Sequence, residues 1–295
     1  MEYKLFPGCL IQNRVPFLEA SARYVFEKVG LQVSDSEFGC CPNPVGIKPT
    51  DTKTWLALGA RNLCLAEKEN KPIMSLCNGC YQSLFCVNHE LQKDEIAKRE
   101  INEMLAKVGK EYKGTTEVMH FVNVLATEVG FDKIKKAIVK PLTGLKVACH
   151  AGCHYSRPSH ILHNEDPFKP QFLRKLVECT GATVIDYEAD WLCCGNVVRN
   201  ANEGVANTML KAKLDSAMKA GAECLAVNCP ACFQTYDNDQ GKLKDLAAEG
   251  QVYKFPIYYI TELLAMAMGK DPKDMGIPFH RNKGSEVLSK IGFEI

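Results

Sequence analysis

Cys77-Asn-Gly-Cys80-Tyr-Gln-Ser83 and Cys229-Pro-Ala-Cys232-Phe-Gln-Thr235 are two copies of one motif in this 295-residue chain. An adjacent pair precedes each copy, Cys40-Cys41 in the first half and Cys193-Cys194 in the second. Further upstream lies a single cysteine after glycine, Gly8-Cys9 or Gly152-Cys153. The halves therefore have the patterns C-x30-CC-x35-CxxC and C-x39-CC-x34-CxxC. Matching motifs at matching spacings indicate an internal duplication.

The segments between the cysteines alternate between helical and strand-like patterns. Hydrophobic periodicity predicts helices over residues 17–29, 55–66 and 118–125 in the first half, and over 172–179, 205–220 and 256–263 in the second. Short strands are expected at 31–33, 72–76, 182–185 and 224–227. This alternation predicts an α/β fold of two pseudo-twofold related repeats, each a small, mainly parallel sheet flanked by helices. The cysteines fall on loops at strand ends, where such folds bind ligands.

The same patterns divide the chain into three parts. Residues 1–140 form the first repeat with its linker helices, residues 141–270 the second repeat, and residues 271–295 a loosely structured tail with one short helix. In the linker we expect an exposed helix within residues 89–113. Its packing stripe comprises Ile96, Ile101, Leu105 and Val108.

Charge and hydropathy exclude several classes of function. The chain has 36 Lys and Arg against 35 Asp and Glu, a net charge of +1, so it has no basic field for nucleic acid. The longest apolar run, residues 255–268, is well short of the ~20 residues that span a bilayer. The N-terminal residues have no signal-peptide pattern, so we expect a soluble cytoplasmic protein. Fifteen cysteines in a reducing compartment indicate metal or redox chemistry.

Each half offers five clustered cysteines. Neighbouring side chains in an extended segment point to opposite sides, so the pairs Cys40-Cys41 and Cys193-Cys194 suit a polynuclear centre better than one compact ion. A zinc site would usually combine two nearby CxxC pairs, and each half has only one. The ferredoxin run for cubane clusters is also missing. Iron-sulfur binding is favoured, while a zinc or iron-sulfur scaffold without catalysis stays open.

The duplicated cysteine pattern resembles the cysteine-rich CCG domain family, and within it the B subunits of the heterodisulfide reductases of methanogenic archaea. The resemblance covers roughly residues 1–270. It implies two noncubane 4Fe-4S clusters, each held by five cysteines, and reduction of the coenzyme M and coenzyme B heterodisulfide to two thiols. It also implies partners that deliver electrons, a ferredoxin-like iron-sulfur subunit and a flavoprotein subunit. The implied ligands are Cys9, Cys40, Cys41, Cys77 and Cys80 for one cluster, and Cys153, Cys193, Cys194, Cys229 and Cys232 for the other.

Other residues near these motifs are candidates for further roles. His154 follows a ligand and is the first candidate proton donor for the released thiolates. Cations near the second cysteine set could bind the anionic groups of the substrate. They are Arg157, Arg199, Lys211 and Lys213. Pro42 stands where the motif has Gly195, and it lacks the N–H that glycine could offer to a cluster sulfur.

Two further points complete the predictions. Buried structural thiols are expected at the remaining cysteines, Cys64, Cys86, Cys149, Cys179 and Cys224. The alternative function is that of a CCG-domain subunit in another oxidoreductase complex, one that acts on lactate, glycolate or fumarate.

Overall fold

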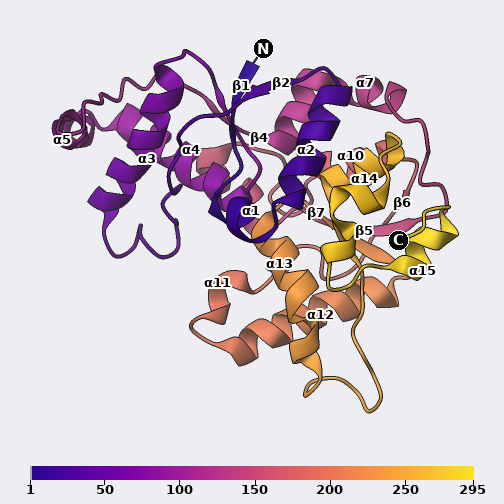
Figure 1. Cartoon of the computed structure of the whole chain (residues 1–295). Helices are drawn as coiled ribbons and strands as arrows, with labels where there is room; N and C mark the ends of the chain where they lie inside the picture. The colour runs from indigo at the N-terminus through magenta and orange to yellow at the C-terminus, as the bar shows by residue number, and fades with distance from the viewer. Residues whose placement is uncertain (1) are drawn as a thin grey trace.

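Strands of the two halves form separate parallel sheets of the same topology (Figure 1). The computed structural model describes residues 2–295, and in that range each sheet has four strands. The first sheet has the order β2-β1-β3-β4, and the second has the order β6-β5-β7-β8. The strands are β1 (Glu2–Phe6), β2 (Gln32–Ser34), β3 (Ile73–Ser75), β4 (Val118–His120), β5 (Lys146–His150), β6 (Thr183–Ile185), β7 (Cys224–Val227) and β8 (Ile257–Tyr259). The predicted α/β duplication is confirmed.

Helices provide the crossover connections that parallel strands require. In the first half they are α1 (Cys9–Arg14), α2 (Phe17–Lys28), α3 (Thr52–Glu67), α4 (Asn78–Lys93), α5 (Glu95–Ala106), α6 (Phe121–Asn123), the π-helix η1 (Val124–Gly130) and α7 (Phe131–Lys136). In the second they are α8 (Cys153–Ser156), α9 (Ser159–Leu162), α10 (Phe172–Cys179), α11 (Asn196–Arg199), α12 (Glu203–Lys219), α13 (Pro230–Asn238) and α14 (Ile260–Ala267). Short 3-10 helices η2 (Asp239–Leu243), η3 (Pro272–Met275) and η4 (Ile277–Phe279) and helix α15 (Ser285–Lys290) complete the chain.

Equivalent helices begin in the same way in the two repeats. The Asp51 carboxylate accepts a hydrogen bond from Thr54 N and caps α3. The Asn202 side chain accepts one from Val205 N and caps α12. Such caps satisfy backbone donors that the first helical turn leaves free. They fix the start of each long helix. A residue of α3 can therefore be matched with the residue of α12 that lies the same number of positions after the cap.

Two strands of each sheet were not expected from the sequence, the first along the chain (β1 and β5) and the last (β4 and β8). Residues 118–125 and 256–263 were expected to be helical throughout, but each segment starts with a three-residue strand, β4 or β8. The strand passes into a helix without a turn residue, so the sequence contains no punctuation between them. His120 and Tyr259 end the two strands. Both side chains consequently lie at the edge of the sheet where the cysteine loops emerge.

The repeats pack against each other reciprocally. Helix α2 of the first repeat lies beside α14 of the second, as Figure 1 shows, and Ser21 Oγ is 2.7 Å from Thr261 Oγ1 between them. Helix α10 of the second repeat contacts α6 and α7 of the first. At the centre, the Tyr259 hydroxyl donates to Leu76 O, and Asn228 O lies 3.4 Å away. Leu76 and Asn228 each precede a CxxC motif, so this one side chain ties the two motifs together.

Two local expectations need correction. In α5, Ile101 and Leu105 are buried as expected. Ile96, in the first turn of α5, and Val108, two residues after α5 ends, are each 64% exposed and so lie outside the packed surface. The last 25 residues are not loosely structured: Met275, Ile277 and Leu288 are buried in the hydrophobic core, and the polar side chain of His280 is buried as well. One short helix, α15, does lie near the end of the chain.

Candidate metal centre

The first cysteine of each set follows a glycine that permits a very close approach of the chain. Cys9 and Cys153 open short helices directly after β1 and β5. The preceding Gly8 and Gly152 have φ of +83° and +78°, which side chains other than glycine rarely adopt. A Cβ on Gly8 would lie 2.8 Å from Cys80 Sγ. Glycine is therefore required here for the cysteines of one set to come together.

The CxxC motifs lie at helix N-termini. Cys77 and Cys229 are the N-cap residues of α4 and α13, directly after the central strands β3 and β7, and Cys80 and Cys232 lie in the first turn. Free backbone N–H groups at a helix N-terminus give a positive local field. That field favours thiolate over thiol, which is the form that binds metal.

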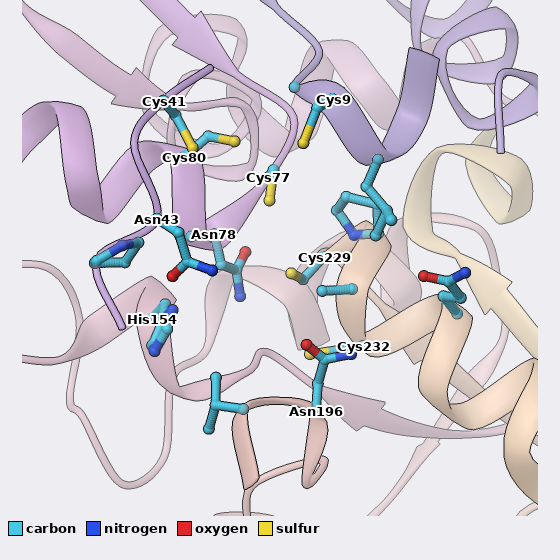
Figure 2. Close-up of a pocket in the computed structure, with 18 of the residues that line it drawn as sticks. Cys9, Cys41, Asn43, Cys77, Asn78, Cys80, His154, Asn196, Cys229 and Cys232 are labelled. Atoms are coloured by element: carbon cyan, nitrogen blue, oxygen red, sulfur yellow. The ribbon is translucent and has the colours of Figure 1, made fainter. Parts of the chain in front are cut away.

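One cavity of about 320 Å³ receives both sets of cysteines (Figure 2). All ten candidate ligands line it. Cys9 and Cys40 are exposed, Cys153 and Cys193 are partly exposed, and the other six are buried. None of the fifteen cysteines, all within the described residues, forms a disulfide. The sequence motifs thus come together in a single site built from two repeats.

Sulfur atoms lie close together within each set and between the sets. Cys153 Sγ and Cys193 Sγ are 4.0 Å apart, and Cys194 Sγ and Cys232 Sγ are 3.5 Å apart. Sulfur contacts with Cys232 and Cys77 lower the pKa of Cys229 well below its usual value, and the contact with Cys229 raises the pKa of Cys77. Figure 2 shows Cys77 of the first set and Cys229 of the second near the centre of the cavity, where the two sets approach each other. The two sets of ligands therefore meet at the first cysteine of each CxxC motif.

The loop after the second cysteine pair has the donor that the first loop lacks. Gly195 N donates to Cys193 Sγ over 3.4 Å. Pro42, at the matching position, has no N–H. Gly195 has φ +84°, and a Cβ there would lie 3.0 Å from Ala206 O, so the loop needs glycine. The two sets thus share their sulfur ligands but differ in their hydrogen bonds.

His154 lines the same cavity and reaches toward the other repeat. Its Nδ1 lies 3.6 Å from the point that a Cβ on Gly79 would occupy, within the CxxC motif of the first repeat. Helices α8 and α4 are in contact, and Asn78 Nδ2 donates to Ala151 O over 2.6 Å. His154 therefore follows Cys153 of the second set and faces Gly79 in the CxxC motif of the first, on the wall of the cavity (Figure 2).

The four candidate cations lie elsewhere. Arg157 Nη2 donates to Pro167 O over 2.9 Å, and Lys211 pairs with Asp215. Arg199 forms ion pairs with Glu203 and Asp239. Lys213 is completely buried in the second repeat. Among the residues that the structure describes, none of the four lines the cavity. Their role in substrate binding stays a prediction.

Polar side chains that the sequence did not single out also line the cavity. They are Asn43, Asn78, Asn196 and Gln234. Each lies within four residues of a ligand, and that short distance along the chain was the signal that could have identified them. A ring nitrogen of His150 and the sulfurs of Cys194 and Cys232 all lie within 4.8 Å of one another.

The five other cysteines are core thiols. All are buried, and none lines the cavity in the described part of the chain. Burial raises the pKa of Cys64 to about 12 and that of Cys86 to about 11. Burial also raises the pKa of Cys149, Cys179 and Cys224. Thiols of this kind stay protonated and contribute packing rather than ligation.

A family model for a cysteine-rich domain, CCG, matches residues 3–85 and 147–236, once in each repeat. The chain belongs to this cysteine-rich CCG domain family. All ten candidate ligands fall within the two matched segments. An all-sulfur set of free thiols around one cavity fits an iron-sulfur centre, since such clusters are bound by cysteine thiolates.

Relatives of known name agree with this family assignment. The B subunit of a ferredoxin:CoB-CoM heterodisulfide reductase from Methanosarcina mazei is 37% identical, over 97% of this chain and 96% of its own length. The B subunit of a ferredoxin/F420H2-dependent CoB-CoM heterodisulfide reductase from Methanosarcina acetivorans is 38% identical over the same shares. An 8-methylmenaquinol:fumarate reductase membrane anchor subunit of Wolinella succinogenes is 31% identical over 94% of this chain and 95% of its own length. Together these CCG-family relatives support an oxidoreductase subunit.

A solved structure shares the fold. A hypothetical protein from Helicobacter pylori superposes with a TM-score of 0.74 at 17% identity, over 95% of this chain. The CCG-family chain spans 52% of that protein's length. Within residues 2–295, no helix is both long enough and apolar enough to cross a bilayer.

Proposed function

We propose that this chain is the catalytic iron-sulfur subunit that reduces the coenzyme M and coenzyme B heterodisulfide to two thiols. The observation that carries the proposal is the single cavity lined by five cysteines from each repeat. Reduction of one disulfide consumes two electrons and two protons. A site with two related halves can approach both sulfurs of a substrate from opposite sides.

The ten cysteines would hold two noncubane 4Fe-4S clusters. The first would be bound by Cys9, Cys40, Cys41, Cys77 and Cys80, and the second by Cys153, Cys193, Cys194, Cys229 and Cys232. When bound, such clusters would supply electrons to the disulfide. The buried cysteines hold the inner side of each set away from water. Exposed Cys9 and Cys40 leave the outer side of the first set open, and Cys153 and Cys193 leave that of the second partly open. A substrate can therefore enter without opening the protein core.

His154 is proposed to supply a proton to a released thiolate. It is partly exposed, lines the cavity and lies beside Gly79 of the opposite CxxC motif. A histidine side chain can donate a proton as imidazolium and regain it from water, which is the role of a general acid. The side chain is thus within reach of a substrate held between the two cysteine sets.

Electrons would come from a partner. We infer a ferredoxin-like iron-sulfur subunit, itself supplied with electrons by a flavoprotein subunit, in a cytoplasmic complex. Support comes from the Methanosarcina relatives, whose names describe them as subunits of ferredoxin-dependent reductases.

A second candidate function is that of a subunit in a fumarate reductase complex. The Wolinella succinogenes relative, which covers almost the whole chain, favours it. In that case the cavity would serve a thiol or quinol couple rather than the heterodisulfide. The two candidates share the iron-sulfur ligands and differ in substrate.

An anaerobic turnover assay separates them. The purified, cluster-loaded chain is given a reduced artificial electron donor and the heterodisulfide, and thiol release is measured. Parallel reactions contain the two symmetric disulfides, fumarate, and 2-hydroxy acids with an artificial acceptor. We expect selective thiol release from the heterodisulfide. Turnover of fumarate or a 2-hydroxy acid alone would support the second candidate, and a fully loaded chain without thiol release would contradict the first.

A further inference from the structure

Matching positions in the two repeats carry different buried side chains beside the cysteines. His150 ends β5 and lies three residues before Cys153, where Phe6 ends β1 ahead of Cys9. Lys213 lies eleven residues after the N-cap of α12, where Asn62 has the same place in α3. Each of the four side chains is at most 2% exposed. The second cysteine set thus has an imidazole and an ammonium where the first has a phenyl ring and an amide.

Lys213 determines how the His150 ring presents its nitrogens. Lys213 Nζ lies 2.7 Å from Asp190 O, 3.2 Å from His150 Nδ1 and 3.4 Å from the Tyr187 hydroxyl. An ammonium group has three donors and no acceptor, so Nδ1 accepts from it. The single ring proton is consequently on Nε2.

The Nε2 atom faces the second cysteine set. A Cβ on Gly152 would lie 3.7 Å from His150 Nε2 and 3.5 Å from Cys232 Sγ, so the two atoms share one small space. Nε2 is fully buried and has no hydrogen-bond partner among the described residues. The ring is also held from its side, because Tyr236 packs against it edge-on with centroids 5.1 Å apart. A fixed donor without a protein acceptor is thus directed at the ligand sulfurs.

We propose that Lys213 holds His150 so that its Nε2–H donates to the sulfurs around Cys194 and Cys232, and that this bond raises the reduction potential of the second centre alone. The inference rests on the proposed iron-sulfur function. Reduction adds negative charge to a centre and its sulfurs, so a hydrogen-bond donor stabilises the reduced form more than the oxidised form. Lys213 is the positioning residue here, and its full burial favours this role over contact with a substrate anion.

The first set has no corresponding donor at these positions. Phe6 offers only a hydrocarbon ring, and the amide of Asn62 is bonded to the loop through Gly39 N and Cys40 O. Pro42 likewise lacks the N–H that Gly195 donates to Cys193. Cys9 and Cys40 are more exposed than Cys153 and Cys193, and exposure to solvent changes the reduction potential of a centre independently of these donors. The proposal therefore concerns the change on substitution and not the order of the two potentials.

Potentiometric titration of the loaded chain, followed by electron paramagnetic resonance, tests the proposal. His150→Phe installs the residue of the first repeat and should lower one midpoint potential while the other stays constant. Lys213→Met, which removes the anchor of Nδ1, should shift the same potential in the same direction by less. His150→Gln keeps an N–H near the Nε2 position and should recover most of the wild-type value. Phe6→Leu is the matched control at the same place in the first repeat, with both potentials unchanged.

Each outcome has a defined meaning. Unchanged potentials in His150→Phe, or equal shifts of both centres, would overturn the proposal and leave His150 with a packing role. If His150→Phe loads less iron, Lys213→Met decides, and an unchanged potential there overturns it as well. Iron and sulfide contents of the wild-type chain are measured first. A chain without iron-sulfur centres would contradict the proposed function, which separates that failure from failure of the inference.

Discussion

Two glycines determine how closely the first cysteine of each set can approach its partners. Gly8 and Gly152 both have a positive φ. Gly8 lies directly against Cys80 Sγ, and Gly152 lies directly against Asn78 Nδ2. The sequence indicated their importance only by repeating Gly-Cys in both halves. The structure gives the reason, because a Cβ at either place would come within 2.8 Å of its neighbour.

Gly8→Ala should therefore impair the first centre selectively. The left-handed backbone alone costs roughly 1–2 kcal/mol for a residue with a Cβ, and Cys80 must also move. We expect about half of the wild-type iron content, measured on the purified chain. Gly144→Ala is the control, since Gly144 also has positive φ but its Cβ would meet nothing within 4 Å. Equal iron contents in both variants would contradict the role of Gly8.

A second residue-scale prediction concerns His154. His154→Gln should lower thiol release by about 10²-fold, the lower end of general acid catalysis, while iron content stays unchanged. His160→Gln is the control, because His160 is exposed and does not line the cavity. Anaerobic turnover of the heterodisulfide measures both variants. Wild-type turnover of His154→Gln would remove this residue as the proton donor.

At the scale of elements, the start of α14 contains a buried pair that should respond to pH. Glu262 Oε2 accepts from Tyr259 N, and Glu262 Oε1 lies 2.9 Å from His280 Nε2. Burial lowers the pKa of His280, but the effect of the Glu262 carboxylate, which raises it, is larger in sum. The pKa of His280 therefore lies above its usual value. The His280 contribution to folding is thus fully present below about pH 6.5 and is lost as the pH rises through the raised pKa.

The corresponding experiment compares thermal unfolding of the wild type and His280→Gln at pH 6 and pH 9. The wild type should exceed the variant in free energy of unfolding by more at pH 6 than at pH 9. The difference between the two margins should be about 1.4 kcal/mol for a pKa of His280 that folding raises by one. A margin independent of pH would show that the pair is not charged in the folded protein.

The elements also explain which predictions from sequence succeeded. The cysteine loops could be placed at one edge because the carboxyl ends of parallel strands lie together. The strands β4 and β8 were missed because three residues run into a helix without a turn. Lys211 and Lys213 could not be distinguished, although residues two apart on a helix face different directions. Only tertiary packing against Tyr187 and Asp190 shows that Lys213 is interior.

For the whole molecule, duplication creates one site from two similar halves with unequal surroundings. The reciprocal packing of α2 on α14 and of α10 on α6 and α7 brings both cysteine sets to one cavity. Gly195 N donates to Cys193 Sγ in the second half, where Pro42 of the first half has no N–H, and His150 stands where the first half has Phe6. A disulfide has two sulfurs that need not be alike, and a site with two unlike halves suits such a substrate.

Iron and acid-labile sulfide analysis of the anaerobically purified chain shows whether the ten cysteines bind two iron-sulfur centres. Two four-iron centres predict about eight iron and about eight sulfide per chain. Cys77→Ser and Cys229→Ser should each retain about half of both, and the core variant Cys64→Ser should retain all. Two zinc ions without sulfide, or iron contents that neither CxxC variant lowers, would contradict the account.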